Sequence, residues 1–211
     1  MLFIFDWDGT LIDSTDKIVS CMQSTILSLD LPFRDYGDVV SIIGLGLPEA
    51  IEVLFPGIRS SLAVSLISRY SACFVEADQV PCEFYPHVMA TLGGLRSDGH
   101  QLAIATGKSR RGLQRVLANL QLEAFFDATR CADETASKPH PMMLEQLLEE
   151  LGCQGSSAVM VGDTEFDLEM AANIGMKSIG VSYGAHSVER LQRHAPELII
   201  DDLSELLPWS L

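Results

Sequence analysis

Two carboxylates stand directly after a short apolar segment near the N-terminus. Residues 2–5 read LFIF, and residues 6–10 read DWDGT. In an extended chain, residues two positions apart share a side, so Asp6 and Asp8 face one small volume if the strand geometry persists past Asp6. Like charges at that distance require a cation or a shared proton. The glycine that follows allows a sharp turn, and Thr10 adds a hydroxyl donor beyond it.

Three later segments add further reactive groups, each next to a short apolar run or at the start of a helix. They supply a hydroxyl with a neighbouring glycine, an amine, and two more carboxylates: Thr106 and Gly107, Lys138, and Asp163 and Asp167. Carboxylates, a hydroxyl and an amine are together the groups that hold Mg²⁺ and a phosphoryl group. We expect these segments to meet at the carboxyl edge of a parallel sheet, where α/β folds bind their ligands.

The elements that must position these groups follow from the apolar pattern. After an initial strand at 2–5, strands are expected at 101–105, 128–131, 158–161 and 178–181, with an edge strand at 198–200. Helices are expected between them at 86–95, 109–120, 141–151 and 166–174. This alternation predicts an α/β fold, a doubly wound, Rossmann-like parallel sheet.

Residues 14 to 83 interrupt the alternation, because they show helical periodicity and no convincing strand. Four helices are expected there: one that starts at Ser14 or Thr15 and ends before Pro32, and others near 39–43, 48–55 and 60–77. Consecutive helices between βα segments indicate an inserted bundle. The predicted organisation is an α/β core of residues 1–13 and 84–211 with a helical cap of residues 14–83.

The ordered set of motifs resembles the haloacid dehalogenase superfamily of aspartate-dependent phosphotransferases, most closely its phosphoglycolate-phosphatase-like branch. The resemblance spans nearly the whole chain, and the combination of motifs is far more specific than any one of them. It implies a Mg²⁺-dependent hydrolase of small phosphate monoesters, phosphoglycolate among them, that works through an aspartyl-phosphate intermediate.

The resemblance also implies roles for the two N-terminal aspartates. Asp6 matches the nucleophile, which is also a metal ligand and is phosphorylated during the reaction. Asp8 matches the acid/base residue, whose main-chain carbonyl ligates Mg²⁺ while its carboxyl protonates the leaving oxygen and then activates water. Because dehalogenating members lack this second aspartate, Asp8 argues against carbon–halogen cleavage. Trp7, between the two, is expected to point into packing.

The remaining site residues match the later motifs of the family. Thr106 and the amide of Gly107 match donors to phosphoryl oxygens, and Lys138 matches an ammonium that spans nucleophile and phosphate. Asp163 matches the principal metal aspartate. Asp167, one helical turn later, matches a second acid that binds metal-bound water or orients Lys138. We expect Asp167 and Thr10 to orient the residues that bind the metal without binding the metal themselves.

Composition restricts the partners. The chain has 211 residues, of which 29 are acidic and 14 basic, giving a formal charge of −15. A surface this acidic repels phosphate backbones and anionic lipids, so neither nucleic acid nor a membrane is expected as a main partner. A small phosphate ester would likewise be repelled unless a metal or a few basic residues supply local positive charge.

Cysteine usage and the N-terminus point to a cytoplasmic protein. The five cysteines are scattered and form no CxxC pair, so we expect reduced, mostly buried thiols. The N-terminal apolar stretch is too short for a signal peptide, and no window approaches the length of a membrane span. The sequence leaves open whether the protein is a monomer or a homodimer.

Two other functions stay open at this stage. A β-phosphoglucomutase-like phosphosugar mutase is one, although the acid that precedes the metal aspartate in some mutases is Gly162 here. A non-catalytic binding or regulatory protein is the other, and the intact motif set argues against it. The basic patch that follows Thr106 is expected to be an exposed helix face, with substrate attraction as the alternative: Lys108, Arg110, Arg111 and Arg115. The five histidines share no metal-binding spacing, so packing or surface roles are expected for them.

Overall fold

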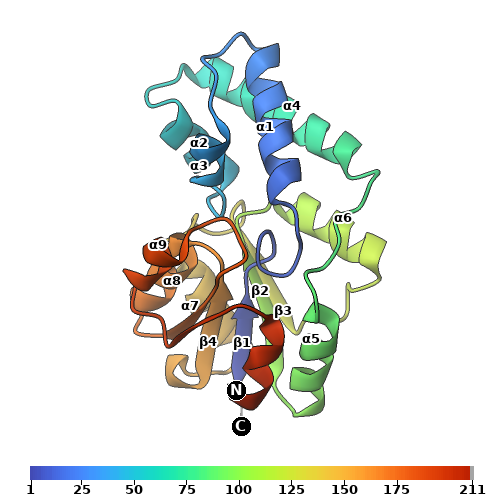
Figure 1. Ribbon diagram of the computed structural model, residues 1–211, viewed down its shortest axis with the longest axis vertical. Coiled ribbons are helices and arrows are strands. Elements are labelled where there is room, and N and C mark those ends of the chain that lie inside the picture. Colours follow the sequence, from blue (N-terminus) through green and yellow to red (C-terminus); the bar gives the residue numbers. More distant parts are fainter. Residues whose placement is uncertain (210–211) are drawn as a thin grey trace.

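The computed structural model describes residues 1–209, and its centre is a six-stranded parallel sheet with the order β3-β2-β1-β4-β5-β6 (Figure 1). The strands are β1 (Leu2–Phe5), β2 (Gln101–Thr106), β3 (Ala128–Cys131), β4 (Ala158–Gly162), β5 (Lys177–Val181) and β6 (Leu198–Ile200). The chain runs outward from β1 through β2 to β3 and then returns to place β4 on the other side of β1. This reversal creates a crevice at the carboxyl ends of β1 and β4, and it confirms the predicted doubly wound fold.

The four residues of β1 are fully buried because helices cover both faces of the sheet. Phe3 and Phe5 face one layer, and Leu2 and Ile4 face the other. The first layer contains α5 (Val88–Ser97), α6 (Arg110–Leu120) and the C-terminal α10 (Leu206–Trp209). The second contains α7 (Met142–Leu151) and α8 (Glu165–Ala172). Alternation along one short strand thus supplies both halves of the core.

The segment between β1 and α5 forms a helical lobe above the carboxyl edge of the sheet (Figure 1). Its helices are α1 (Thr15–Ser28), α2 (Tyr36–Val40), α3 (Leu47–Leu54) and α4 (Ser60–Ala77). The lobe has its own apolar core, which includes Val19, Met22, Ile26, Ile51 and Leu66. The two connections to the sheet run side by side, since Ile12 pairs with Phe84 in an antiparallel bridge.

The expected helices and strands are present, and two features differ from the sequence analysis. The second helix of the lobe starts earlier, at Tyr36, because Asp35 and Asp38 form a capping box at its start. The C-terminal region also contains short elements that the apolar pattern does not predict: α9 (Val188–Gln192), a 3₁₀ turn (Leu203–Glu205) and α10. These segments have one or two turns, too few for a clear period.

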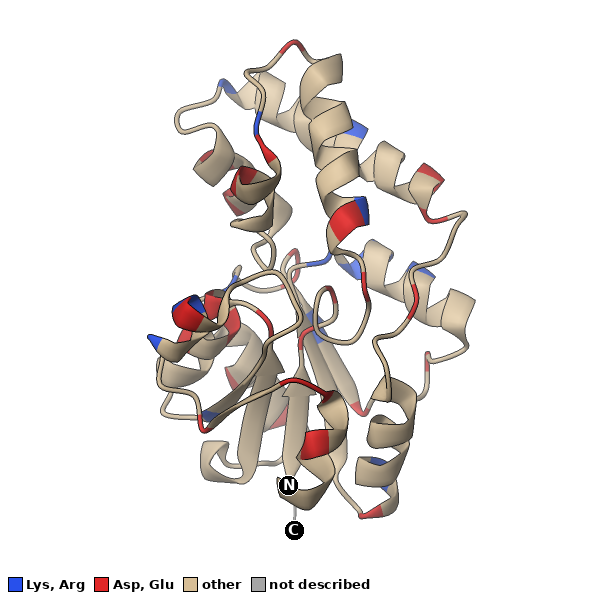
Figure 2. Ribbon diagram, viewed as in Figure 1, with Lys and Arg blue, Asp and Glu red and all other residues tan. Residues whose placement is uncertain are grey.

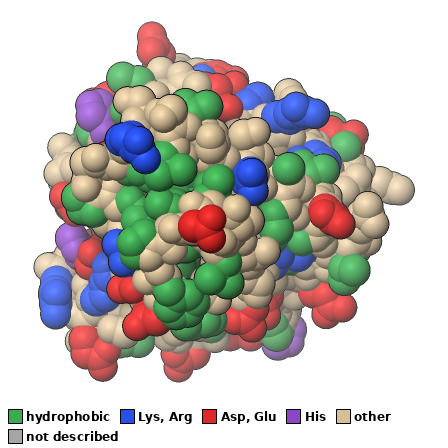
Figure 3. All heavy atoms as spheres, turned by 90° about the horizontal axis from the view of Figure 1, so that it is seen from above, with side chains coloured by type: hydrophobic (Ala, Val, Ile, Leu, Met, Phe, Trp, Pro, Cys, Tyr) green, Lys and Arg blue, Asp and Glu red, His purple; other side chains and the backbone are tan. Residues whose placement is uncertain are grey.

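Trp7 is buried in the core, as expected. All five cysteines are unpaired. Cys21 and Cys131 are buried and the other three are half-buried, so fewer thiols are buried than expected. No helix within residues 1–209 is long and apolar enough to cross a membrane. Viewed from above, the molecule shows hydrophobic side chains gathered near the middle of the face, among charged ones (Figure 3).

Candidate active site

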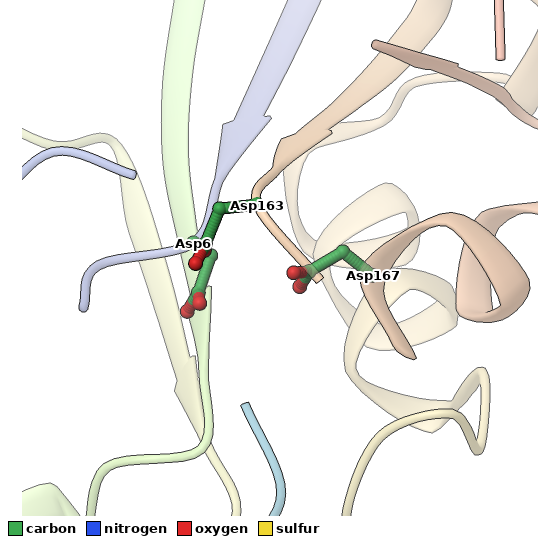
Figure 4. A group of neighbouring side chains, drawn as sticks. All are labelled: Asp6, Asp163 and Asp167. Carbon is green, nitrogen blue, oxygen red and sulfur yellow. The ribbon is translucent and has the colours of Figure 1, made fainter. Parts of the chain in front are cut away.

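Three buried aspartates meet at the crevice between β1 and β4. Asp6 follows β1, Asp163 follows β4, and Asp167 lies in the first turn of α8. One carboxylate oxygen of each lies within 4.8 Å of the others, and all three side chains are buried. Figure 4 shows Asp167 pointing from α8 toward the other two. Three oxygen donors in a buried cluster are suited to a hard divalent cation such as Mg²⁺.

Lys138 lies against the same cluster and is itself buried. Its Nζ is 2.8 Å from Asp6 Oδ1 and 2.6 Å from Asp167 Oδ1. Burial alone would lower the pKa of this amine, but the two carboxylates outweigh that effect and raise the pKa above its ordinary value. Lys138 is therefore an ammonium that joins the acid after β1 to the acid on α8.

The negative charge of the three carboxylates is only partly balanced by Lys138. Burial raises the pKa of Asp6 well above its ordinary value despite the nearby Lys138. Burial also raises the pKa of Asp163 to about 7, and the Asp167 carboxylate adds to that shift. In addition, Asp6 Oδ2 is buried without a hydrogen-bond partner in the described part of the chain. One lysine does not compensate three buried acids, so the donor set fits a divalent cation.

Two short contacts with glycines keep the cluster compact. A Cβ on Gly9, where φ is +83°, would lie 2.2 Å from Asp163 Oδ2. A Cβ on Gly162 would lie 2.4 Å from the Cβ of Asp167. Around them, Thr10 Oγ1 donates a 2.8 Å hydrogen bond to Asp163 Oδ1. The hydroxyl of Thr10 thus helps to fix the orientation of the Asp163 carboxylate.

Asp167 is also fixed by the start of its helix. Its Oδ2 accepts hydrogen bonds from the Thr164 amide at 3.1 Å and from Thr164 Oγ1 at 2.7 Å. This capping box at the N-terminus of α8 leaves the other oxygen free to contact Lys138. The local sequence thus aims one oxygen of Asp167 into the site.

Asp8 has a different environment from Asp6. The strand ends at Phe5, so strand geometry does not continue to Asp8, and its carboxylate is not part of the three-acid cluster. Its Oδ1 accepts a 2.8 Å hydrogen bond from Ser14 Oγ, and its two oxygens lie 3.0 and 2.9 Å from Lys108 Nζ. Asp8 and Asp6 nevertheless line one cavity.

Thr106 and Gly107 complete the core side of that cavity. Thr106 is the last residue of β2 and is buried. Gly107 lies so close to the loop after α2 that a Cβ there would be 2.6 Å from the main-chain oxygens of Gly44 and Leu45. On the other side of the site, the Gly46 amide donates a 2.7 Å hydrogen bond to Ser137 Oγ, next to Lys138. The helical lobe thus contacts the loops that carry Thr106 and Lys138.

The cavity has a volume of about 970 Å³ and lies between the sheet and the helical lobe. Its core side includes the carboxylates of Asp6 and Asp8 and the hydroxyl of Thr106. Its lobe side is largely apolar and includes Ile18, Met22, Ile67, Tyr70 and Phe74. Such a site can hold a charged group at the sheet edge and a larger, partly apolar group beneath the lobe.

The structure also places near the site two residues for which a surface or packing position was the first expectation. Lys108 was expected on an exposed helix face, but its side chain is only 11% exposed and pairs with Asp8. His186 is buried, and its Nδ1 accepts a 3.1 Å hydrogen bond from the Glu165 amide at the start of α8. Burial lowers the pKa of His186 to about 4. The position of Lys108, directly after Thr106-Gly107, is the one signal that could have indicated a site role.

Comparisons with known proteins agree with this geometry. The protein named "Probable phosphatase IndB" from Dickeya dadantii (strain 3937) is 35% identical over 210 residues, covering 98% of this chain and 91% of that protein. "Pyrophosphatase PpaX" from Bacillus cereus (strain AH820) is 31% identical over 206 residues, covering 97% and 94%. The crystal structure of a predicted phosphatase from Clostridium acetobutylicum superimposes with a TM-score of 0.88 at 26% identity, covering 99% and 97%.

The family comparison covers five of the six strands, the lobe and the site residues from Asp6 to Asp167. Residues 3–181 match the family described as "Haloacid dehalogenase-like hydrolase". This range and the long alignments with the relatives agree with the resemblance found in the sequence. The chain therefore belongs to the haloacid dehalogenase-like hydrolase family.

Proposed function

We propose that this protein is a Mg²⁺-dependent phosphatase that hydrolyses small phosphate esters through a phosphorylated Asp6. The observation that carries the proposal is the buried contact of Lys138 with Asp6 and Asp167 at 2.8 and 2.6 Å, next to Asp163. An ammonium and a cation-binding cluster around one carboxylate suit the approach of an anionic phosphoryl group. The names of two similar proteins, a phosphatase and a pyrophosphatase, support the reaction class.

In the proposed reaction, Asp6 attacks phosphorus and the bond to the leaving oxygen breaks. Asp8 protonates that oxygen and then accepts a proton from the water that hydrolyses the acyl phosphate. The Thr106 hydroxyl and the Gly107 amide donate to phosphoryl oxygens, and Lys138 balances their charge. Asp6 and Asp163 with the main-chain carbonyl of Asp8 would hold Mg²⁺, with Asp167 orienting Lys138. The cation would supply charge neutralisation at the phosphoryl oxygens.

The competing functions receive less support. An acid in place of Gly162, as in some sugar phosphomutases, would meet Asp167, because even a Cβ there lies 2.4 Å from that side chain. A purely binding protein would have no need of a buried, costly set of three carboxylates with one lysine. Location in the cytoplasm remains part of the proposal, which the unpaired cysteines support.

Phosphate release from p-nitrophenyl phosphate and from a panel of metabolite phosphates tests the proposal. Wild type with Mg²⁺ should turn over, whereas excess EDTA and the Asp6→Asn variant should each abolish turnover. Asp98→Asn is the matched control, because Asp98 is an exposed aspartate in the turn after α5 and should leave the rate unchanged. Full activity in EDTA would contradict the metal assignment, and no activity on any phosphate ester would contradict the proposed function.

A further inference from the structure

The basic residues of α6 and the loop before it divide between two environments. Arg110 turns toward β3, where its guanidinium binds Glu134 and Thr129. The other three line the cavity in a row: Lys108 in the loop before the helix, and Arg111 and Arg115, which lie four residues apart and so share one face of it. Figure 2 shows the basic residues of α6 beneath α1 and α4. The expectation of an exposed helix face is thus wrong for Lys108, whose side chain is 11% exposed. Arg111 is exposed, as expected, and it also lines the cavity, which agrees with the alternative of substrate attraction.

Only the middle member of this row lacks an acidic partner among residues 1–209. Lys108 pairs with Asp8 at 2.9 Å and lies 4.7 Å from the centre of the Phe74 ring. Arg115 pairs with Asp78 at 2.6 Å. Arg111 makes no ion pair or hydrogen bond there, and it has like charges three residues before it and four after it. Because Lys108 and Arg115 are already paired with carboxylates, Arg111 is the member of this row that is left to bind an anion from outside the chain.

The cavity can accept such an anion. Its volume of about 970 Å³ exceeds what a phosphoryl group fills, so it has room for a leaving group as well. Glu49, Glu76 and Asp133 also line it, but none forms an ion pair with Arg111. Asp133 instead accepts a 2.8 Å hydrogen bond from the Arg110 amide at the start of α6. Arg111 therefore remains available at the wall of the cavity in a chain whose net charge repels anions.

We propose that Arg111 determines substrate specificity by binding a second anionic group, a carboxylate or a second phosphate, on the leaving group of the substrate. This inference rests on the proposed function, since it assumes that the phosphoryl group binds at Asp6. The guanidinium suits both anions because it presents paired donors in one plane. The preferred substrates are then phosphate compounds with two anionic ends, and the apolar lobe side packs against what joins them.

Turnover of four probes tests the proposal with Mg²⁺ present. 2-Phosphoglycolate carries a carboxylate, inorganic pyrophosphate a second phosphate, phosphoethanolamine an ammonium, and p-nitrophenyl phosphate no second charge. For Arg111→Gln we expect kcat/KM to fall by about 10- to 100-fold on at least one of the first two probes, mostly through KM. On the last two probes, kcat/KM should change less than about twofold, and Arg111→Lys should recover part of the loss on the anionic probes.

The matched control is Arg193→Gln, which removes an unpaired, exposed arginine outside the cavity lining. It should leave all four probes unchanged. An equal loss on every probe, or no loss on either dianionic probe, would overturn the assignment of Arg111. A wild-type kcat/KM that is much higher on phosphoethanolamine than on the other probes would overturn the assignment as well. Such a result would show that Glu49 and Glu76 select a cation.

A binding experiment separates this proposal from the proposed function. Phosphonoacetate and ethylphosphonate have similar sizes, cannot release phosphate, and differ in the second anionic group. Calorimetric titration of the Mg²⁺-loaded protein should show tighter binding of phosphonoacetate in wild type, by about 10-fold or more, and equal binding of the two in Arg111→Gln. If the protein turns over no ester but shows this difference, the proposed hydrolysis fails and the role of Arg111 stands. If the protein turns over esters but shows no such difference in binding, the proposed hydrolysis stands and the role of Arg111 fails.

Discussion

Asp6 and Asp8 are two residues apart, yet their surroundings assign them different chemistry. Asp6 is buried beside Lys138, whereas Asp8 contacts Ser14 and Lys108 at the cavity wall. With an activated aryl phosphate, whose leaving group departs without a proton, Asp6→Asn should lower turnover by on the order of 10⁴-fold or more. Asp8→Asn should still phosphorylate Asp6, because it keeps the main-chain carbonyl, and should then hydrolyse the adduct slowly.

Rapid-mixing kinetics check this difference. Asp8→Asn should give a burst close to one product per protein, with a phosphorylated chain visible by mass spectrometry. Asp6→Asn should give neither. A burst in Asp6→Asn would assign the nucleophile to another residue, and Asp8→Asn without burst or adduct would remove the acid/base role from Asp8.

The raised pKa of Asp163 leads to a second prediction, which concerns how the stability of the metal-free protein depends on pH. Its carboxyl keeps a proton in the folded state up to a pH of about 7, whereas in the unfolded chain it ionises near its ordinary value. Stability from this group is therefore present at low pH and is lost as pH rises toward 7 and beyond. In EDTA, the Tm of wild type should fall relative to Asp163→Asn by about 5 °C between pH 5.5 and 8.

Calorimetry at the two pH values measures the effect, with Asp98→Asn as the control that should follow wild type. Mg²⁺ should raise the wild-type Tm more at pH 8 than at pH 5.5, because the cation replaces the missing proton. A constant difference between wild type and Asp163→Asn at both pH values would refute the prediction.

At the scale of elements, the loop after α2 reaches the site because Gly107 has no side chain. A Cβ on Gly107 would approach the main-chain oxygens of Gly44 and Leu45 to 2.6 Å, and neither backbone group can rotate away. Gly107→Ala should therefore displace this loop from the site and lower kcat/KM by on the order of 10²-fold, with a small effect on Tm.

The control for this substitution is Gly93→Ala. Gly93 lies inside α5, and a Cβ there meets nothing within 4 Å. Alanine should leave activity unchanged and raise Tm slightly, because it favours a helix more than glycine does. If Gly107→Ala keeps full activity, close contact between this loop and Gly107 is not needed for turnover.

Elements with strong patterns were predictable from the sequence, and so were residues that follow them directly. Asp6, Thr106 and Asp163 each stand at or after the end of a buried strand, so the position of the strand fixes the position of the residue. The pairing of Lys108 with Asp8 joins residues 100 positions apart, and no local pattern encodes it. The contact between Gly46 and Ser137 was missed for the same reason.

At the scale of the whole molecule, the helical lobe and the sheet have separate cores. The principal lobe cluster contains residues of α1 to α4 and the loops between them, whereas both clusters around the sheet contain none from those helices. The links between the two parts lie side by side, since the Asp13 amide donates to the Glu83 carbonyl at 2.9 Å. The boundaries of a cap at residues 14 and 83 stay a prediction, which this geometry makes testable.

Deleting residues 14–82 and joining the flanking segments through two glycines should therefore leave a sheet that still folds. The shortened protein keeps Asp6, Lys138 and Asp163 but loses the apolar lobe side of the cavity, which in our proposal excludes water and contacts the leaving group. We expect weak hydrolysis of p-nitrophenyl phosphate and similar kcat/KM values for all other esters, with circular dichroism and a cooperative melt to verify folding. Asp6→Asn in the shortened protein should remove the remaining activity. If the folded deletion keeps the wild-type order of substrates, the helical lobe does not select the substrate.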